Sequence, residues 1–275
     1  MSALSIRTFA GSNRSLTSMR RSGGRQQAAV QRLSSGLRVQ KASDGSAALA
    51  MGQTMSAQLR GLQQARRNAN DGVNMLQGAE GAYQSISSTI SRLQELAVEA
   101  ANDSLSDVER GMLDTEYQEL LVEIERITDV QEWNGILTVD PQDTFLTFQV
   151  GTRNSANDII RYEIKDQNPG FLGISGTSID TRANAQTAVG NLEGASNNLH
   201  EDRAALGSTL NKLRTAIANL DSSVEDYASS IGKVRDADMG RQSAEFTRQQ
   251  VLQQAGVAML AQGNASPSVA LKLLG

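Results

Sequence analysis

The chain has 275 residues, of which 39% are hydrophobic and only 4% aromatic, and its formal net charge is −4 at pH 7. Because it contains no cysteine, disulfides, thiolate metal sites and cysteine nucleophiles are excluded, and no apolar run approaches the roughly 18 residues that span a bilayer. We therefore expect one large or two ordinary domains, built from long helices that pack through small and aliphatic side chains, without membrane insertion.

The first 43 residues are strongly basic, with seven arginines, one lysine and no acidic residue. A secretory signal needs an apolar core of about 7–15 residues, which this segment lacks, so composition alone suggests a cytosolic protein. A transit peptide and a nucleic-acid-binding arm are alternatives for such a segment. We expect neither, because the segment continues into the helical body without a boundary and carries no recognised nucleic-acid-binding module.

Arginines recur along this segment at spacings of 7, 7, 4 and 7 residues, which places them on one face of a helix. These arginines are Arg7, Arg14, Arg21, Arg25 and Arg32. Together with Leu33 and Leu37 they mark an N-terminal core helix. The cationic stripe is typical of a helix that lies against acidic partners or lines a water-filled channel, and a solvated surface explains it equally well.

Heptad spacing dominates residues 62–127 and predicts two helices that bury an apolar seam. The two seam positions are formed by Leu62, Leu76, Tyr83, Ile90 and Ala97, and by Ala65, Ala79, Ile86, Leu93 and Ala100. Residues 102–104 break the pattern, and Ser106 with Glu109 has the spacing of a capping box. The second helix, through residues 113–127, has apolar residues at spacings of 4, 3, 4 and 3.

Between the helical halves the pattern changes to a strict alternation of apolar and polar residues. The apolar positions are Leu146, Phe148 and Val150, followed by Ile160, Tyr162 and Ile164. Turn signals at Asp140-Pro141 and Asn157-Asp158 bound them. This predicts a β-hairpin or small antiparallel sheet within about residues 136–180, followed by a glycine-rich loop and a helix that resumes near Ala185.

The C-terminal half contains the most regular seam of the chain. Strict 4-3 alternation runs over four heptads through Leu206, Leu210, Leu213, Ile217, Leu220, Val224, Tyr227, Ile231 and Val234. A coiled-coil helix is predicted, and from Leu199 to Val234 it would be about 50 Å long. The whole chain therefore predicts a mainly α fold, in which the N- and C-terminal halves form a long antiparallel bundle with a small β-hairpin region in the middle.

The last 26 residues are apolar, although chain ends are normally polar unless something covers them. We expect an apolar helix, a break at Pro267 and a second apolar stretch. The apolar residues are Val251, Leu252, Ala255, Met259, Leu260, Val269, Leu271, Leu273 and Leu274. We interpret this tail as a docking element.

Motifs for catalysis or for a cofactor do not occur in the sequence. His200 is the single histidine, and the stretch that begins with it lacks the second histidine of a zinc-protease helix. There is no phosphate-binding loop and no dinucleotide-binding glycine pattern. We expect a protein that is not an enzyme and that holds no cofactor or metal.

Seven short motifs follow one another along the chain. They read RLSSGLR (32–38), VQKASDGSAALAM (39–51), RNANDG (67–72), AEGA (79–82), QELAV (94–98), EWNG (132–135) and VLQQAGVAMLAQ (251–262). In this order they closely resemble bacterial flagellin, the filament subunit of the flagellum, over essentially the whole chain. The short connection after the hairpin region indicates a minimal form without the variable outer domains.

The resemblance implies a structural subunit that polymerises into a helical filament for swimming motility. Residues 1–43 and 235–275 would form the inner helical domain as a coiled-coil pair, and residues 44–234 a rod-like domain. It also implies export to the cell exterior without a cleaved signal, which overrides the cytosolic expectation. A flagellar hook–filament junction protein, which has related ends, is the alternative.

The resemblance also implies partners. The tail would be covered by an export chaperone before assembly and by neighbouring subunits afterwards, and hook-associated and cap proteins would contact the filament. Some flagellins are sensed by the flagellin-recognising Toll-like receptor through an arginine, a leucine and a glutamate. The aligned residues here are Arg92, Leu96 and Glu116.

Overall fold

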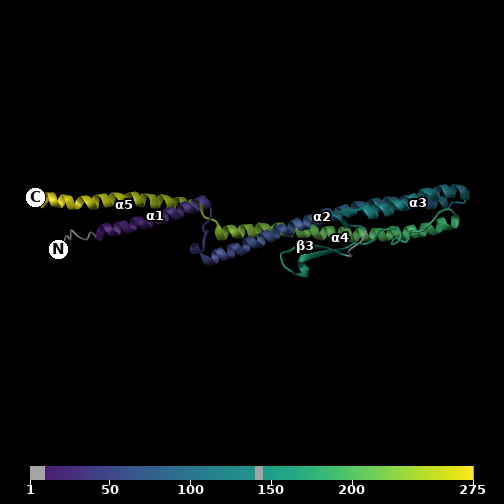
Figure 1. Cartoon of the computed structure of the whole chain (residues 1–275), viewed down its shortest axis with the longest axis horizontal. Helices are drawn as coiled ribbons and strands as arrows, with labels where there is room; N and C mark the ends of the chain where they lie inside the picture. Colours follow the sequence, from purple (N-terminus) through teal and green to yellow (C-terminus); the bar gives the residue numbers. More distant parts are fainter. Residues whose placement is uncertain (1–9, 140–144, 275) are drawn as a thin grey trace. The chain divides into compact units, whose positions relative to one another are not determined.

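The computed structural model describes residues 10–139 and 145–274, with side chains for residues 13–139 and 145–262. The chain is mainly helical (Figure 1). The α-helices are α1 (Ala10–Ser35), α2 (Ser46–Ala100), α3 (Asp107–Val130), α4 (Arg182–Arg235) and α5 (Met239–Leu274), and short 3-10 helices lie at η1 (Ala42–Asp44) and η2 (Ala156–Asp158). The predicted mainly α fold with a small antiparallel β region in the middle is confirmed.

The chain divides into two compact units, one formed by Met1–Ala57 with Tyr227–Gly275 and the other by Gln58–Asp226. Both boundaries fall inside the long helices α2 and α4. The division expected from the sequence, at 43/44 and 234/235, lies close to the start of α2 and the end of α4 and stays a prediction. The first unit contains the α1·α5 pair, and the second contains the main apolar core.

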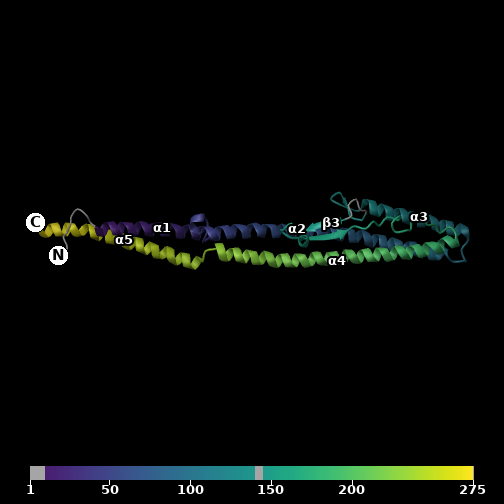
Figure 2. The same ribbon diagram turned by 90° about the horizontal axis from the view of Figure 1, so that it is seen from below.

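In the second unit, α3 and α4 lie along α2, as Figures 1 and 2 show. Both seams predicted for α2 point into the core, and Tyr83, Ile90 and Leu93 are at most 1% exposed. Burying a side chain of this size contributes roughly 1.5–3 kcal/mol of stability. Heptad spacing therefore identified the residues that hold this unit together.

The seam of α4 is fully buried only over its first part. Leu206 and Leu213 are 0% exposed, whereas Ile217 and Val224 are half-buried. Because α3 ends where Gln131 lies beside Gly78 of α2, the later stretch of α4 packs along α2 without this third helix. An exposed ion pair between Arg66 and Asp221 (2.9 Å) joins α2 and α4 there.

The turn between α2 and α3 is closed by polar contacts. Ser106 is the N-cap of α3, and the Glu109 carboxylate accepts a hydrogen bond from the Ser106 backbone N–H at 2.7 Å, as the capping-box spacing predicted. Arg110 is 6% exposed, and its guanidinium donates to the backbone carbonyls of Ala100 and Asn102, both at 2.8 Å. These bonds satisfy carbonyl groups that the end of α2 would otherwise leave unpaired.

The strands form two short antiparallel hairpins. β1 (Glu132–Trp133) pairs with β2 (Ile136–Leu137), and β3 (Phe145–Gln149) pairs with β4 (Ile159–Glu163). The predicted alternation is confirmed because Leu146, Tyr162 and Ile164 are buried and the other apolar positions are half-buried. Phe148 lies on α2 where a Cβ at Gly72 would come within 2.7 Å of its ring, so this contact requires glycine.

The predicted break at Pro267 is wrong, because α5 continues as one helix from Met239 to Leu274. Proline removes one backbone donor and crowds the carbonyl of the preceding turn, which costs about 3 kcal/mol inside a helix. The other backbone hydrogen bonds on either side of such a residue remain available, so the helix continues past it.

Among the helices that the structure describes, none combines the length and the apolar character of a membrane-spanning segment.

Two buried tyrosines join the β3–β4 hairpin to α2. The Tyr83 and Tyr162 hydroxyls are 3.2 Å apart, and both side chains are at most 3% exposed. Burial raises the pKa of Tyr162 to about 12 and raises the pKa of Tyr83 further still, with the neighbouring Tyr162 contributing. Both hydroxyls therefore stay protonated at pH values where free tyrosines begin to ionise.

These pKa shifts predict an alkaline loss of stability. A tyrosine whose folded pKa is raised contributes its full stability below pH 10, and this is lost as the pH rises toward the folded value. Between pH 10 and pH 12 we expect the free energy of unfolding to fall by up to about 1.4 kcal/mol per pH unit for each tyrosine. Urea unfolding at pH 8 and pH 11 would measure this. In the double variant Tyr83→Phe/Tyr162→Phe, the free energy of unfolding should change much less between the two pH values. If it falls as much as in the parental chain, these two tyrosines do not cause the alkaline loss of stability.

Candidate functional site

The helices α1 and α5 form an antiparallel pair in the first unit and lie side by side in Figures 1 and 2. Gly36, at φ 72°, ends α1 in the left-handed conformation that favours glycine, and its N–H donates to the Arg32 carbonyl at 2.9 Å. Its carbonyl in turn accepts the Ala237 N–H at 2.8 Å, and Leu37 pairs with Asp236. The glycine of the RLSSGLR motif thus fixes the base of the pair.

The contact between α1 and α5 is formed by small and polar side chains. Ser22 and Ala29 of α1 are at most 7% exposed, and Gln242 and Gln249 of α5 are at most 9% exposed. The Ser22 hydroxyl lies 2.9 Å from the Gln249 Oε1 and 3.1 Å from its backbone carbonyl. Ser22 and Ala29 are seven residues apart, as are Gln242 and Gln249, so heptad spacing occurs here too. Three of these four buried positions are polar.

The apolar tail predicted from the sequence is exposed wherever its side chains are described. Val251 is 58%, Leu252 52% and Met259 69% exposed. Ala255 is also exposed, and Leu260 is half-buried. The side chains of Val269, Leu271, Leu273 and Leu274 lie outside the described residues. A helix with large apolar residues left uncovered is a candidate surface for protein contacts.

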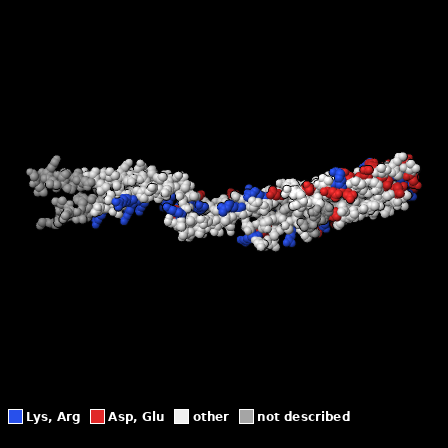
Figure 3. Space-filling model, viewed as in Figure 1, with Lys and Arg blue, Asp and Glu red and all other residues white. Residues whose placement is uncertain are grey.

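Basic side chains gather on the visible face of α1, as the space-filling view shows (Figure 3). Arg14, Arg21 and Arg25 are exposed and Arg32 is half-buried, whereas Arg7 lies outside the described residues. Within the described part of the chain these arginines form no salt bridge. Positive charge is therefore left for another partner or for solvent.

The arginine stripe and the apolar tail border one groove. A groove of about 360 Å³ between α1 and α5 is lined by Arg21 and Arg25 on one side and by Leu252 and Met259 on the other. Leu33 and Leu37 are half-buried near the base of the pair. Charged and apolar groups thus border the same groove.

On the second unit, the three residues aligned with the receptor motif do not lie together on the surface. Arg92 and Glu116 form an exposed ion pair between α2 and α3, with Nη2 and Oε1 2.7 Å apart, and Arg92 also bonds Glu95 at 3.0 Å. Leu96 is only 1% exposed and belongs to the core. The alignment of residue types could not show that Leu96 lies on the buried side of α2.

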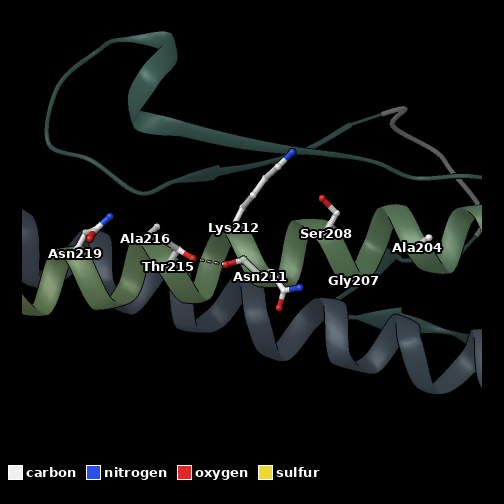
Figure 4. A pocket seen from close by; sticks show the side chains of 8 residues that line it. All are labelled: Ala204, Gly207, Ser208, Asn211, Lys212, Thr215, Ala216 and Asn219. Atoms are coloured by element: carbon white, nitrogen blue, oxygen red, sulfur yellow. Dashed lines mark hydrogen bonds between the residues drawn. The ribbon is translucent and has the colours of Figure 1, made fainter.

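A further feature was not singled out from the sequence. A shallow, open patch of small and polar residues runs along α4 (Figure 4). They are Ala204, Gly207, Ser208, Asn211, Lys212, Thr215, Ala216 and Asn219. The Thr215 hydroxyl donates to the Asn211 carbonyl of its own helix at 2.9 Å. Small residues at spacings of three and four along the sequence could have indicated this face, which permits close approach of another backbone.

Groups of three or more histidine, aspartate or glutamate side chains placed to hold a metal ion do not occur among the described residues. His200 lies exposed on α4, 3.3 Å from the Ser196 hydroxyl. The features that stand out are therefore helical surfaces rather than a pocket with reactive groups.

Two family models match the chain. The bacterial flagellin N-terminal helical region matches residues 6–142, and the bacterial flagellin C-terminal helical region matches residues 189–274. Flagellin from Halalkalibacterium halodurans is 37% identical over 250 residues, which cover 90% of this chain and 91% of that protein. The similarity thus extends over nearly the full length of both chains.

Solved structures show the same likeness. Bacillus cereus flagellin aligns with a TM-score of 0.51 and 28% identity, over 56% of this chain and 88% of its own. A putative flagellar hook-associated protein from Vibrio parahaemolyticus aligns with a TM-score of 0.59 over 70% of this chain and 100% of its own. At 14% identity, the second likeness shows the fold alone.

The different positions of Arg92 and Leu96 predict different effects of substitution. Leu96→Ala removes a buried side chain and should lower the free energy of unfolding by about 2–5 kcal/mol. Arg92→Ala removes an exposed ion pair and should change it by less than about 1 kcal/mol. Urea unfolding of the two variants, followed by circular dichroism, compares them. Equal losses in both would show that the ion pair is more than a surface contact.

Proposed function

The chain belongs to the bacterial flagellin family and is a subunit of the flagellar filament, an extracellular appendage, so we propose that it polymerises through the surfaces of α1 and α5. The main support for this proposal is the exposed apolar surface of α5. Apolar groups left in water at this density favour association. The hook–filament junction protein is the weaker alternative, because its support is a likeness of fold at 14% identity.

The geometry of the pair also supports an open polymer. The apolar residues of α5 and the arginines of α1 are different patches on the same subunit. When one patch meets a different patch of an identical copy, the contact repeats without closing and produces a helical polymer. We expect the inner domain, 1–43 with 235–275, to gain order on joining neighbours, because newly buried surface offsets the entropy of ordering.

The cationic stripe of α1 would serve the same assembly. Arg14, Arg21 and Arg25 would lie against acidic groups of neighbouring subunits or along a water-filled channel. The family consists of structural proteins, so we expect no catalytic activity. We further propose that an export chaperone covers the apolar tail before assembly, that cap and hook-associated proteins contact the filament at its ends, and that export needs no cleaved signal.

Removing the tail should abolish assembly but not folding. A variant lacking residues 252–275 should remain a soluble monomer with an intact second unit, because the core of that unit uses no residue of α5. Purified protein added to filament seeds and imaged by electron microscopy tests this. Filaments of normal length from the truncated chain would contradict the role of the tail.

Point variants separate the apolar surface from the length of the chain. Leu252→Ser/Met259→Ser should slow seed elongation by about tenfold or more, because each loses apolar area buried against a neighbour. The matched control Gln250→Ser/Gln254→Ser changes exposed polar residues of the same helix and should elongate seeds at the parental rate. Equal effects of the two pairs would indicate a loss of helix stability instead.

We also propose that the exposed Arg92–Glu116 pair contacts the flagellin-recognising Toll-like receptor, with Leu96 supporting α2 from inside the core. In a reporter-cell assay on the monomer, Arg92→Ala and Glu116→Ala should each reduce the response by about tenfold or more if they are central contacts. Arg126→Ala, which removes an exposed ion pair elsewhere on α3, is the control. Silence of the parental monomer at high dose would rule the contact out.

A further inference from the structure

The face of α5 that meets α1 carries polar residues at its most buried positions. Gln242, Gln249 and Gly256 recur on it every seven residues, and Met19 of α1 lies in van der Waals range of Gly256. Among the described residues of α1 and α5, Ala29 is the single apolar side chain that is fully buried. Apolar burial in this contact is therefore only partial.

Several large apolar residues of α5 stay exposed, among them Val251 and Met259, whereas Phe246 and Leu260 are half-buried. With 3.6 residues per turn, Val251 is rotated by about 200° from Gln249, and Met259 by about 80° in the opposite sense. Both side chains are more than half exposed. Attraction between apolar groups alone would thus allow α5 to rotate about its axis and present Val251 or Met259 to α1.

Hydrogen bonds distinguish these orientations. In the observed one, the Ser22 hydroxyl can donate to the Gln249 Oε1 at 2.9 Å, and the Gln249 amide donates to Glu245 at 2.7 Å. The buried amide therefore has a partner for both of its polar atoms. A rotated α5 would separate Ser22 from Gln249. Gln249 would then be buried against neighbouring subunits without this hydroxyl as a partner, and burying an unpaired polar group costs free energy.

We propose that the Ser22–Gln249 pair fixes the rotational orientation of α5 on α1 and so determines which apolar residues of α5 face neighbouring subunits. One polar position in an otherwise repetitive helix contact can set pairing geometry even where it lowers stability. The proposal rests on polymerisation through α5, the proposed function. It adds the residues that orient the contact surface.

Volume-conserving variants isolate the hydrogen bond. Ser22→Ala/Gln249→Leu keeps the approximate size of both side chains but removes the polar atoms. The exchange Ser22→Gln/Gln249→Ser keeps a hydroxyl and an amide opposite each other. Ser18→Ala/Gln250→Leu makes the first pair of changes at exposed neighbouring positions and is the matched control.

The orientation can be read by disulfide formation, because the chain has no cysteine of its own. Met19→Cys/Gly256→Cys should cross-link in the observed orientation. Met19→Cys/Ala255→Cys reports a helix rotated by about 100°. Each cysteine pair is introduced into the parental chain and the three variants, which are grown on filament seeds, oxidised and analysed by peptide mass spectrometry.

We expect the parental chain to cross-link 19/256 roughly tenfold more than 19/255, in line with the loss of one buried hydrogen bond. The exchanged pair and the control should keep this ratio, and Ser22→Ala/Gln249→Leu should bring it near one. An unchanged ratio in that variant would overturn the proposal. Failure of that variant to extend seeds while the exchanged pair succeeds would support it, and failure of both would overturn it.

Failure of the proposed function can be distinguished from failure of the inference about Ser22 and Gln249. If the parental cysteine variants, kept reduced, do not extend seeds, polymerisation through α5 is at fault and not the orienting pair. If they extend seeds and give equal yields of both cross-links, α5 has no fixed orientation, and the inference about Ser22 and Gln249 is wrong while the proposed function stands.

Discussion

A long helix must cover its apolar stripe, and the fold of the second unit depends on how α2 meets this constraint. α2 has 55 residues, and its seam is buried without interruption from Leu76 to Ala100. α3, α4 and the β3–β4 hairpin each cover a different part of that seam. Alanines at some seam positions allow close approach, while Tyr83 and Ile90 fill the wider spaces. α2, α3, α4 and the β3–β4 hairpin thus share one apolar core.

The first unit follows the opposite principle. The fully buried residues of its two helices are Ser22, Ala29, Gln242 and Gln249, and most large apolar side chains of α5 stay exposed. A pair built in this way has little internal driving force, because hydrophobic burial dominates folding stability. Its apolar surface can be covered only by other molecules. A closed core and an open surface thus exist in one chain.

Much of the fold could be predicted because helical periodicity is local. The seams of α2 and α4, the Ser106 cap and the inward residues of β3 and β4 all follow from spacing within one element. The β1–β2 hairpin could also have been found, since Asn134-Gly135 is the dipeptide that favours its turn. Burial of Leu96, the Ser22–Gln249 contact and the approach of Phe148 to Gly72 depend on residues far apart in sequence. Spacing shows which residues share a face but not which element covers that face.

The two ends of the second unit differ in how firmly their helices are joined. At the α2–α3 turn, the buried guanidinium of Arg110, on α3, donates to carbonyls at the end of α2 and in the turn. Beyond Ile217, the seam of α4 is largely half-buried, and an exposed ion pair adds little. Local opening begins where buried contacts are fewest. We therefore expect thermal separation of α2 and α4 to start near Asp221 and to spread toward the turn, so that this unit opens in one direction.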